Sequence, residues 1–166
     1  VCGITIRLAK PKDERPDRGF LICNVELPAL CSSKNFKQAT VSQSASFSQS
    51  SVSSASIEQT QSMLTQLMQD ILVESKCVDE KDLCIREGKL VWALYIDLVC
   101  LNNDGNVQDA CCLAMVSALK CLKLYQVDYD EENDKKPINV KYPFEWKTLS
   151  LKCEPVCTTL FAIEDN

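Results

Sequence analysis

The sequence predicts an α+β domain with a mixed sheet, and three patterns favour this fold class. Residues 90–101 are apolar almost throughout, which is typical of a central strand covered on both faces. Residues 1–8 alternate between apolar and polar side chains, as a strand with one buried face does. Two longer segments, which begin near Ile57 and Val107, have the helical spacing of apolar residues. Helices and strands of these kinds pack as layers around one core.

The other strands are expected where short apolar segments meet turn-forming residues. A second strand is expected over residues 20–27, because Pro28 ends it, and a charged loop at residues 10–18 with two prolines separates it from the first. Asp104-Gly105 is expected to form the turn after the central strand. Further short strands are expected at residues 124–130, 147–152 and 156–164, with an acidic loop at 128–134.

Two helices are expected, at residues 57 to about 75 and at residues 107–122. Ser56 would cap the first, and Glu58 would lie in its first turn. The second helix is apolar most of the way round, so a second layer such as another subunit is expected to cover it. One of its faces holds small residues that would permit close approach to the sheet: Val107, Ala110, Cys111, Ala114, Ala118 and Cys121.

Residues 1–166 are expected to form a single domain that is a fragment of a longer chain, because the sequence opens on V-C-G-I-T-I-R-L, which resembles the inside of a sheet. A Ser-rich insertion at about residues 38–56 interrupts it. Nine of the fifteen residues from Ser42 to Ser56 are serines, too polar a stretch to build a packed core. We expect this insertion to be mobile.

The charge and the apolar pattern exclude several classes of protein. The net charge is −5, so the isolated chain should bind nucleic acid weakly, although a basic surface shared within a complex is compatible with it. No run of about 18 apolar residues occurs, so no membrane span is expected.

The chain has 11 cysteines and no histidine. Most of the cysteines lie in apolar runs, as buried and reduced thiols do, which indicates an intracellular compartment. Without histidine no Ser–His–Asp or Cys–His arrangement can exist. The pairs Cys77/Cys84 and Cys153/Cys157 lack the spacing of zinc sites. We therefore expect no metal site and no cofactor.

The stretch N-N-D-G-N-V-Q-D-A-C-C-L-A-M, residues 102–115, joins the central strand to the second helix. A strand, a tight turn and a helix N-terminus often form a phosphate cradle. Here, however, Asp109 would repel an anion. The favoured interpretation is that Asn106 caps the helix and Asp109 returns a capping-box contact. Asp97, in the central strand, is expected to be a hydrogen-bonded structural residue rather than a catalytic acid.

Two segments strongly resemble the RNase PH-like ring subunits of the eukaryotic RNA exosome. They are R-P-D-R-G-F-L-I-C-N-V-E-L-P-A-L-C-S-S and E-K-D-L-C-I-R-E-G-K-L-V-W-A-L-Y-I-D-L-V-C-L-N-N-D-G-N-V-Q-D-A. The resemblance implies the RNase PH fold, a ribosomal protein S5 domain 2-like mixed sheet flanked by helices. It also implies heterodimers in a six-membered ring, cap subunits with S1 and KH domains, and a pore that threads single-stranded RNA. The nucleus, nucleolus and cytoplasm would be its locations.

Two departures from the family indicate a non-catalytic subunit. Phosphorolytic members have an Arg pair before the first helix, where this sequence has Ser54, Ala55 and Ser56. They also have Gly, Ser or Thr, and Arg after the turn, where this sequence has residues 106–109. Phosphorolysis needs cations to bind phosphate and to stabilise transferred charge. The alternatives are an active phosphate-dependent 3'-to-5' exoribonuclease and, without any RNA role, an unrelated scaffold domain.

Residues 10–18 match the family's loop at the neck of the pore, where basic side chains guide RNA. The resemblance therefore suggests Lys10, Lys12, Arg15 and Arg18 as RNA contacts, with Lys34 and Lys37 as weaker candidates on the same side. The equally weighted alternative is a solvated loop whose charges pair among themselves, since acidic residues lie between the basic ones: Asp13, Glu14 and Asp17.

Overall fold

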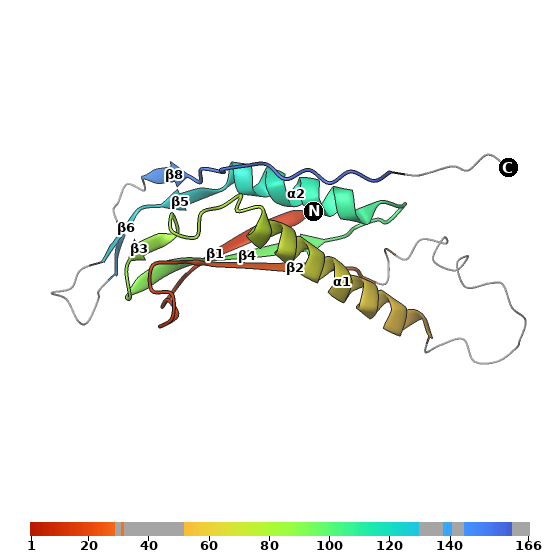
Figure 1. Ribbon diagram of the computed structural model, residues 1–166, viewed down its shortest axis with the longest axis horizontal. Helices are drawn as coiled ribbons and strands as arrows, with labels where there is room; N and C mark the ends of the chain where they lie inside the picture. The colour runs from red at the N-terminus through yellow and green to blue at the C-terminus, as the bar shows by residue number, and fades with distance from the viewer. Residues whose placement is uncertain (29–30, 32–51, 130–137, 141–144, 161–166) are drawn as a thin grey trace, which may run out of the picture.

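The computed structural model describes residues 1–28, 31, 52–129, 138–140 and 145–160 (Figure 1). The helices are α1 (Val52–Glu74) and α2 (Val107–Cys121). The strands of the main sheet are β1 (Cys2–Ala9), β2 (Phe20–Glu26), β3 (Cys84–Arg86) and β4 (Leu90–Val99). Four short strands form two further pairs, β5 (Lys123–Tyr125) with β8 (Trp146–Thr148) and β6 (Val127–Tyr129) with β7 (Ile138–Val140).

The main sheet is mixed, as the sequence predicts. Strand β4 lies between β1, which is antiparallel to it, and β2, which is parallel to it. The first five residues of β4 are all buried, so both of its faces are covered there. The register places Ile4 and Cys23 on either side of Ile96, and the alternation of strands aligns these apolar side chains on one face. The α+β class with a mixed sheet is confirmed.

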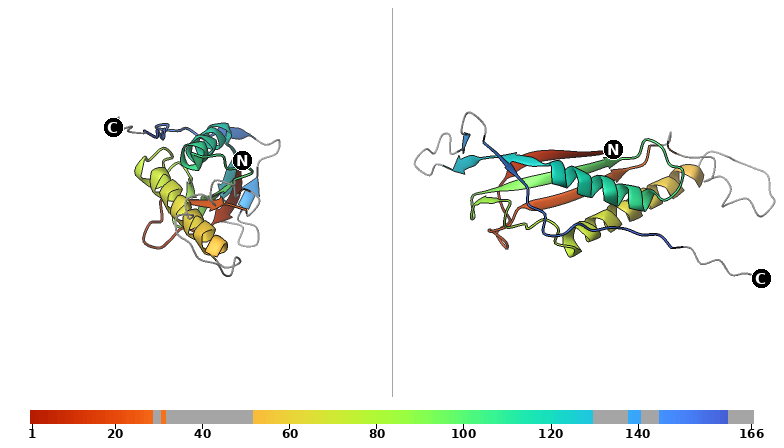
Figure 2. Two further views of the ribbon diagram at one scale, coloured as in Figure 1. Left: turned by 90° about the vertical axis from the view of Figure 1, so that its right-hand side faces the viewer. Right: turned by 90° about the horizontal axis from the view of Figure 1, so that it is seen from above.

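Both helices pack on that face of the sheet (Figure 2). Helix α1 lies along β2, and α2 lies along β1. Met68 and Leu72 of α1, Met115 and Leu119 of α2, and Ile96 of β4 are fully buried in one apolar cluster. Burial of such side chains stabilises the fold by about 1.5–3 kcal/mol each. Within the described residues, no helix is both long and apolar enough to cross a membrane.

Helix α1 also completes the hydrogen bonding of β2, whose outer side has no neighbouring strand within the described part of the chain. Gln69 accepts a hydrogen bond from the Cys23 N–H at 2.8 Å and donates one to the Leu21 carbonyl at 3.1 Å. Thr65 accepts from the Val25 N–H at 3.2 Å, and Gln61 from the Leu27 N–H at 3.3 Å. The three side chains are spaced four residues apart and so share one helix face. They close an edge that would otherwise be open to pairing.

Two expectations about the helices are wrong. Helix α1 begins at Val52 rather than at residue 57, so Ser56 lies inside it and cannot be its N-cap. The buried residues of α2 are Cys111, Cys112, Met115, Val116 and Leu119, of which only Cys111 belongs to the expected small-residue face. The larger side chains are buried because they remove more apolar area from water.

The Ser-rich insertion falls largely outside the described residues. Its residues 38–51 are not among them, and the remainder, residues 52–56, forms the start of α1. The predicted mobility of the insertion stays a prediction.

The expected strands in the last third of the chain are only partly present. The segment expected at residues 124–130 is two strands with different partners, β5 and β6. Strand β8 begins one residue earlier than expected and ends at Thr148. Residues 156–160 form no strand; the segment before them runs in extended form past α2 (Figure 1). The hydrogen bonds of this segment are made outside the strand ladders. The Lys152 N–H donates to the Cys77 carbonyl, and the Cys112 thiol donates to the Pro155 carbonyl.

Candidate functional site

The turn before α2 positions three polar side chains in front of the helix N-terminus. Gly105 and Asn106 both have positive φ, 104° and 50°, and Asn106 occupies the N-cap position. The Asn106 amide donates to the Asp109 carboxylate at 2.7 Å, and its side chain makes no capping bond to a backbone N–H. The expected capping box is therefore wrong in detail. A capping side chain normally extends from backbone in the β region, whereas Asn106 is left-handed.

Thr159 is the third member of this cluster. Its hydroxyl oxygen lies 3.1 Å from Asn106 Oδ1 and 3.1 Å from Asp109 Oδ2, and its single proton can be donated to either. A carboxylate with its own donors thus stands at the positive end of the α2 dipole. No signal in the sequence could have found Thr159, because it comes from a distant segment that the fold brings to the turn.

The cavity beside the turn is apolar. Its volume is about 220 Å³, and no Lys or Arg side chain is among the described residues that line it. Its walls come from the end of β4, the turn and α2, including Leu98, Val107 and Ala110. An arrangement with Asp109 in front and an apolar cavity behind has no basic side chain, among the described lining residues, with which to hold phosphate.

The basic loop at residues 10–18 is anchored to the hairpin of β3 and β4 and to the segment before β3. Gly19 N–H donates to the Glu80 carbonyl at 2.9 Å, and Gly88 N–H donates to the Pro16 carbonyl at 3.0 Å. A Cβ on Gly19 would lie 2.5 Å from Leu83 Cβ and 2.6 Å from the Trp92 carbonyl oxygen, so only glycine fits there. These contacts fix the end of the loop against the sheet.

The loop's four basic side chains have different surroundings. Arg18 pairs with Asp17 at 3.8 Å, as the self-pairing alternative predicts, and with Glu80, outside the loop, at 3.5 Å. Lys12 Nζ lies 6.0 Å from the ring centre of Phe20. Lys10 and Arg15 are exposed and make no ion pair within the described residues. The loop therefore presents two uncommitted cations, while Lys34 and Lys37 lie outside the described residues.

The buried cysteines have the environment of structural thiols. All eleven are free. Burial is the main cause that raises the pKa of Cys23 to about 12 and that of Cys112 to about 11. A thiol with so high a pKa stays protonated near neutral pH and is a poor nucleophile.

Asp97 is half-buried and makes no side-chain hydrogen bond within the described residues, which contradicts its expected structural role.

The mixed sheet, the two helices on one face and the strand–turn–helix unit define an RNase PH domain. The family model described as "3' exoribonuclease family, domain 1" matches residues 1–124, and the chain belongs to this family. Within this family, the segments R-P-D-R-G-F-L-I-C-N-V-E-L-P-A-L-C-S-S and E-K-D-L-C-I-R-E-G-K-L-V-W-A-L-Y-I-D-L-V-C-L-N-N-D-G-N-V-Q-D-A resemble the subunit called ribosomal RNA-processing protein 43. In agreement, the chain is 36% identical over 132 residues to "Exosome complex component rrp43" of Schizosaccharomyces pombe, which covers 80% of this chain and 43% of the relative.

Archaeal proteins show the same relationship. "Exosome complex component Rrp42" of Saccharolobus solfataricus is 30% identical over 159 residues, 94% of this chain and 52% of the relative. The structure "Archaeal exosome core" matches with a TM-score of 0.61 and 25% identity, over 93% of this chain and 47% of that one. The structure "archaeoglobus fulgidus exosome with RNA bound to the active site" matches with a TM-score of 0.63 and 27% identity, over 93% and 50%. The chain spans about half the length of these relatives.

Proposed function

We propose that this chain belongs to a non-catalytic subunit of the six-membered RNase PH-like ring of the exosome. In this role it supports 3'-to-5' RNA processing and decay by forming part of the channel that threads RNA. Its partners are other RNase PH-like subunits, cap subunits with S1 and KH domains, and single-stranded RNA in the assembled pore. The names of the relatives support membership of an exosome complex. The proposed locations are the nucleus, nucleolus and cytoplasm.

The observation that carries the non-catalytic role is the cluster in front of α2. Catalytic phosphorolysis needs cations around the attacking phosphate. Here the carboxylate of Asp109, held by Asn106 and Thr159, stands at the N-terminus of α2, and the adjoining cavity has no basic side chain among its described lining residues; both observations support the proposal. The other cationic element is replaced by Ser54, Ala55 and Ser56, which lie in the first part of α1.

The test is phosphorolysis by the purified full-length subunit. We expect no shortening of single-stranded RNA in the presence of inorganic phosphate and magnesium. A catalytic relative with the Arg pair and the Gly–Ser/Thr–Arg turn serves as the positive control. Release of nucleoside diphosphates in proportion to the phosphate concentration would establish the opposite function, an active phosphate-dependent exoribonuclease.

A further inference from the structure

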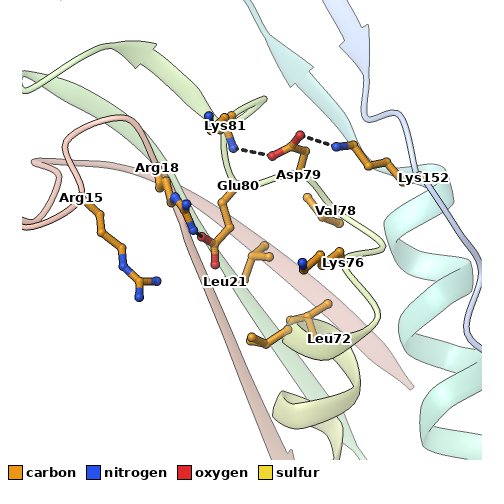
Figure 3. Close-up of a pocket in the computed structure, with 11 residues that line it drawn as sticks. Arg15, Arg18, Leu21, Leu72, Lys76, Val78, Asp79, Glu80, Lys81 and Lys152 are labelled. Carbon is orange, nitrogen blue, oxygen red and sulfur yellow. Dashed lines mark hydrogen bonds and ion pairs between the residues drawn. The ribbon is translucent and has the colours of Figure 1, made fainter.

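A second cavity, of about 260 Å³, lies between the basic loop, the end of α1 and residues 78–81 (Figure 3). Five basic side chains and two carboxylates line it. Its floor is apolar and includes Leu21 and Leu72. A cavity with this excess of positive charge over an apolar floor is suited to an anionic ligand with an apolar part.

Both carboxylates of this cavity already have partners. Glu80 pairs with Arg18 at 3.5 Å. Asp79 pairs with the Lys152 ammonium and accepts the Lys81 N–H at 3.0 Å, and the hydrogen bond from Lys152 lowers the pKa of Asp79. Both acids of the cavity are therefore engaged by neighbouring cations.

Arg15 and Lys76 are the basic lining residues that make no ion pair within the described part of the chain. Figure 3 shows Arg15 on the loop at one side of the cavity and Lys76, just after α1, at the other side, with Leu21 between them. Two uncommitted cations thus face a shared apolar floor from opposite sides. Oxyanions with several acceptor oxygens are bound by such pairs.

The backbone of Lys76 is a further observation. It has a φ of 51°, a left-handed conformation that glycine normally supplies after a helix. The positive charge of Lys76 interacts favourably with the negative end of the helix dipole. A lysine in the last turn of α1 would do the same without a left-handed backbone, yet that turn has no basic residue. Lys76 therefore keeps a long cationic side chain at a position where the backbone favours glycine.

We propose that this cavity binds a phosphate of single-stranded RNA between Arg15 and Lys76. The inference rests on the proposed function, because the RNA reaches the cavity along the basic loop. Guanidinium and ammonium donors contact phosphate oxygens without reading sequence. Val73 lines the cavity and is 43% exposed, so it offers an apolar contact for the sugar or the face of a base.

The experiment replaces Lys76 with Asn in the full-length subunit within the assembled ring. Asn tolerates the left-handed backbone, so the substitution removes the charge and keeps the conformation. We expect affinity for long single-stranded RNA to fall about fivefold at 0.1 M salt, and the slope of log affinity against log salt to decrease by about 0.7, the contribution of one single-strand phosphate contact. Lys123→Asn is the matched control, since Lys123 is exposed and has no ion pair within the described residues.

A double-mutant cycle with Arg15→Gln identifies the shared phosphate. If both side chains hold one phosphate, the effects of Arg15→Gln and Lys76→Asn combine to less than their sum. Equal reductions in affinity from Lys76→Asn and Lys123→Asn would overturn the cavity assignment. If Arg15→Gln weakens RNA binding and Lys76→Asn does not, the proposed role in the RNA channel is retained and the proposed phosphate site in the cavity is wrong. If neither weakens it, both fail.

Inorganic phosphate separates the two sources of the anion. It is titrated into the full-length wild-type subunit and the Lys76→Asn variant, with binding followed by calorimetry. Saturable binding that Lys76→Asn abolishes, together with unchanged RNA affinity in the ring, would show that the cavity takes free phosphate and would overturn the assignment to RNA. If the Asn variant fails to assemble, Lys76→Gly replaces it, because glycine favours the same backbone conformation.

Discussion

Gln69 illustrates how a single polar side chain on a helix can hold a strand in place. Its amide both accepts from the Cys23 N–H and donates to the Leu21 carbonyl, so it satisfies two backbone groups of β2 at once. Buried or partly buried backbone groups that lose their partners cost about 1–3 kcal/mol. The core contacts of α1 would remain without Gln69, but the Cys23 N–H and the Leu21 carbonyl would lose this partner.

We expect Gln69→Leu to lower the free energy of unfolding of the full-length subunit by about 1–3 kcal/mol. Leu retains helix propensity, so the decrease reports the hydrogen bonds rather than the helix. Gln66→Leu is the control: Gln66 is on the same helix, is exposed, and donates a hydrogen bond to Asp70 at 2.7 Å. Urea unfolding measures both variants. Equal effects of the two would show that the hydrogen bonds to β2 contribute nothing.

The cysteines give a second expectation at the scale of the residue. The exposed thiols Cys121 and Cys153 should react with iodoacetamide at pH 8 before Cys23 and Cys112, whose pKa burial raises to about 12 and about 11. Mass spectrometry of labelled peptides follows the order, and urea-unfolded protein, in which all eleven thiols react, is the control. Early labelling of Cys23 would contradict the burial described above.

The same raised pKa makes the fold sensitive to alkali. The folded pKa of Cys23, about 12, exceeds its ordinary value of 9.0. Its contribution to stability is therefore fully present below pH 9 and is lost as the pH rises toward 12. We expect the free energy of unfolding of the wild-type protein to decrease as the pH rises over this range. In the Cys23→Ala variant the same rise in pH should cause a smaller decrease. An equal decrease in the two proteins would remove Cys23 as a cause.

At the scale of the elements, the basic loop depends on its attachment to the hairpin of β3 and β4. Gly19→Ala places a methyl group 2.6 Å from the Trp92 carbonyl oxygen, which belongs to the central strand and cannot move aside. We expect the free energy of unfolding to fall by about 1–3 kcal/mol, the usual cost of overpacking. Gly3→Ala is the matched control, because nothing lies within 4 Å of the added carbon. Thermal unfolding compares the two, and a neutral Gly19→Ala would show that the loop is loosely attached.

Elements with a regular pattern of apolar residues or a marked turn could be predicted from the sequence. Strand β4 is an apolar run, β1 alternates, and α2 follows a turn marked by Asp104-Gly105. The start of α1 was not predictable, because serines have weak helix preference and packing decides where the helix begins. The hydrogen bonds of Gln61, Thr65 and Gln69 to β2 depend on which strand lies at the edge of the sheet, and that follows only from the pairing.

The candidate site also has one part that the sequence predicts and another that only the fold shows. The replacement of cations near α2 is visible in the sequence, since it concerns residues 106–109 alone. Thr159 joins Asn106 and Asp109 only after folding. Likewise Arg15 and Lys76 are far apart in the chain, and they line one cavity only because the fold brings loop 10–18 near the end of α1. Charges in a loop can be recognised from sequence, whereas their pairing cannot.

At the scale of the whole molecule, the net charge of −5 opposes RNA binding by the isolated chain. Any contact of Lys10 and Arg15 with RNA should therefore matter only in the assembled ring, where other subunits contribute positive surface. Arg18 is unsuitable for the test, because Arg18→Glu would place a second carboxylate beside Glu80. The informative variant is Lys10→Glu combined with Arg15→Glu.

We expect this double variant to assemble normally, to weaken binding of long single-stranded RNA, and to flatten the salt dependence by about 0.7 for each phosphate that the loop no longer binds. RNA too short to reach the pore should bind the cap subunits as before. Lys123→Glu combined with Lys147→Glu is the control, since both lysines are exposed and lack ion pairs within the described residues. Fluorescence anisotropy at several salt concentrations measures each ring. An unchanged affinity and slope for long RNA would show that the loop is only solvated, and would leave the subunit with a purely architectural role.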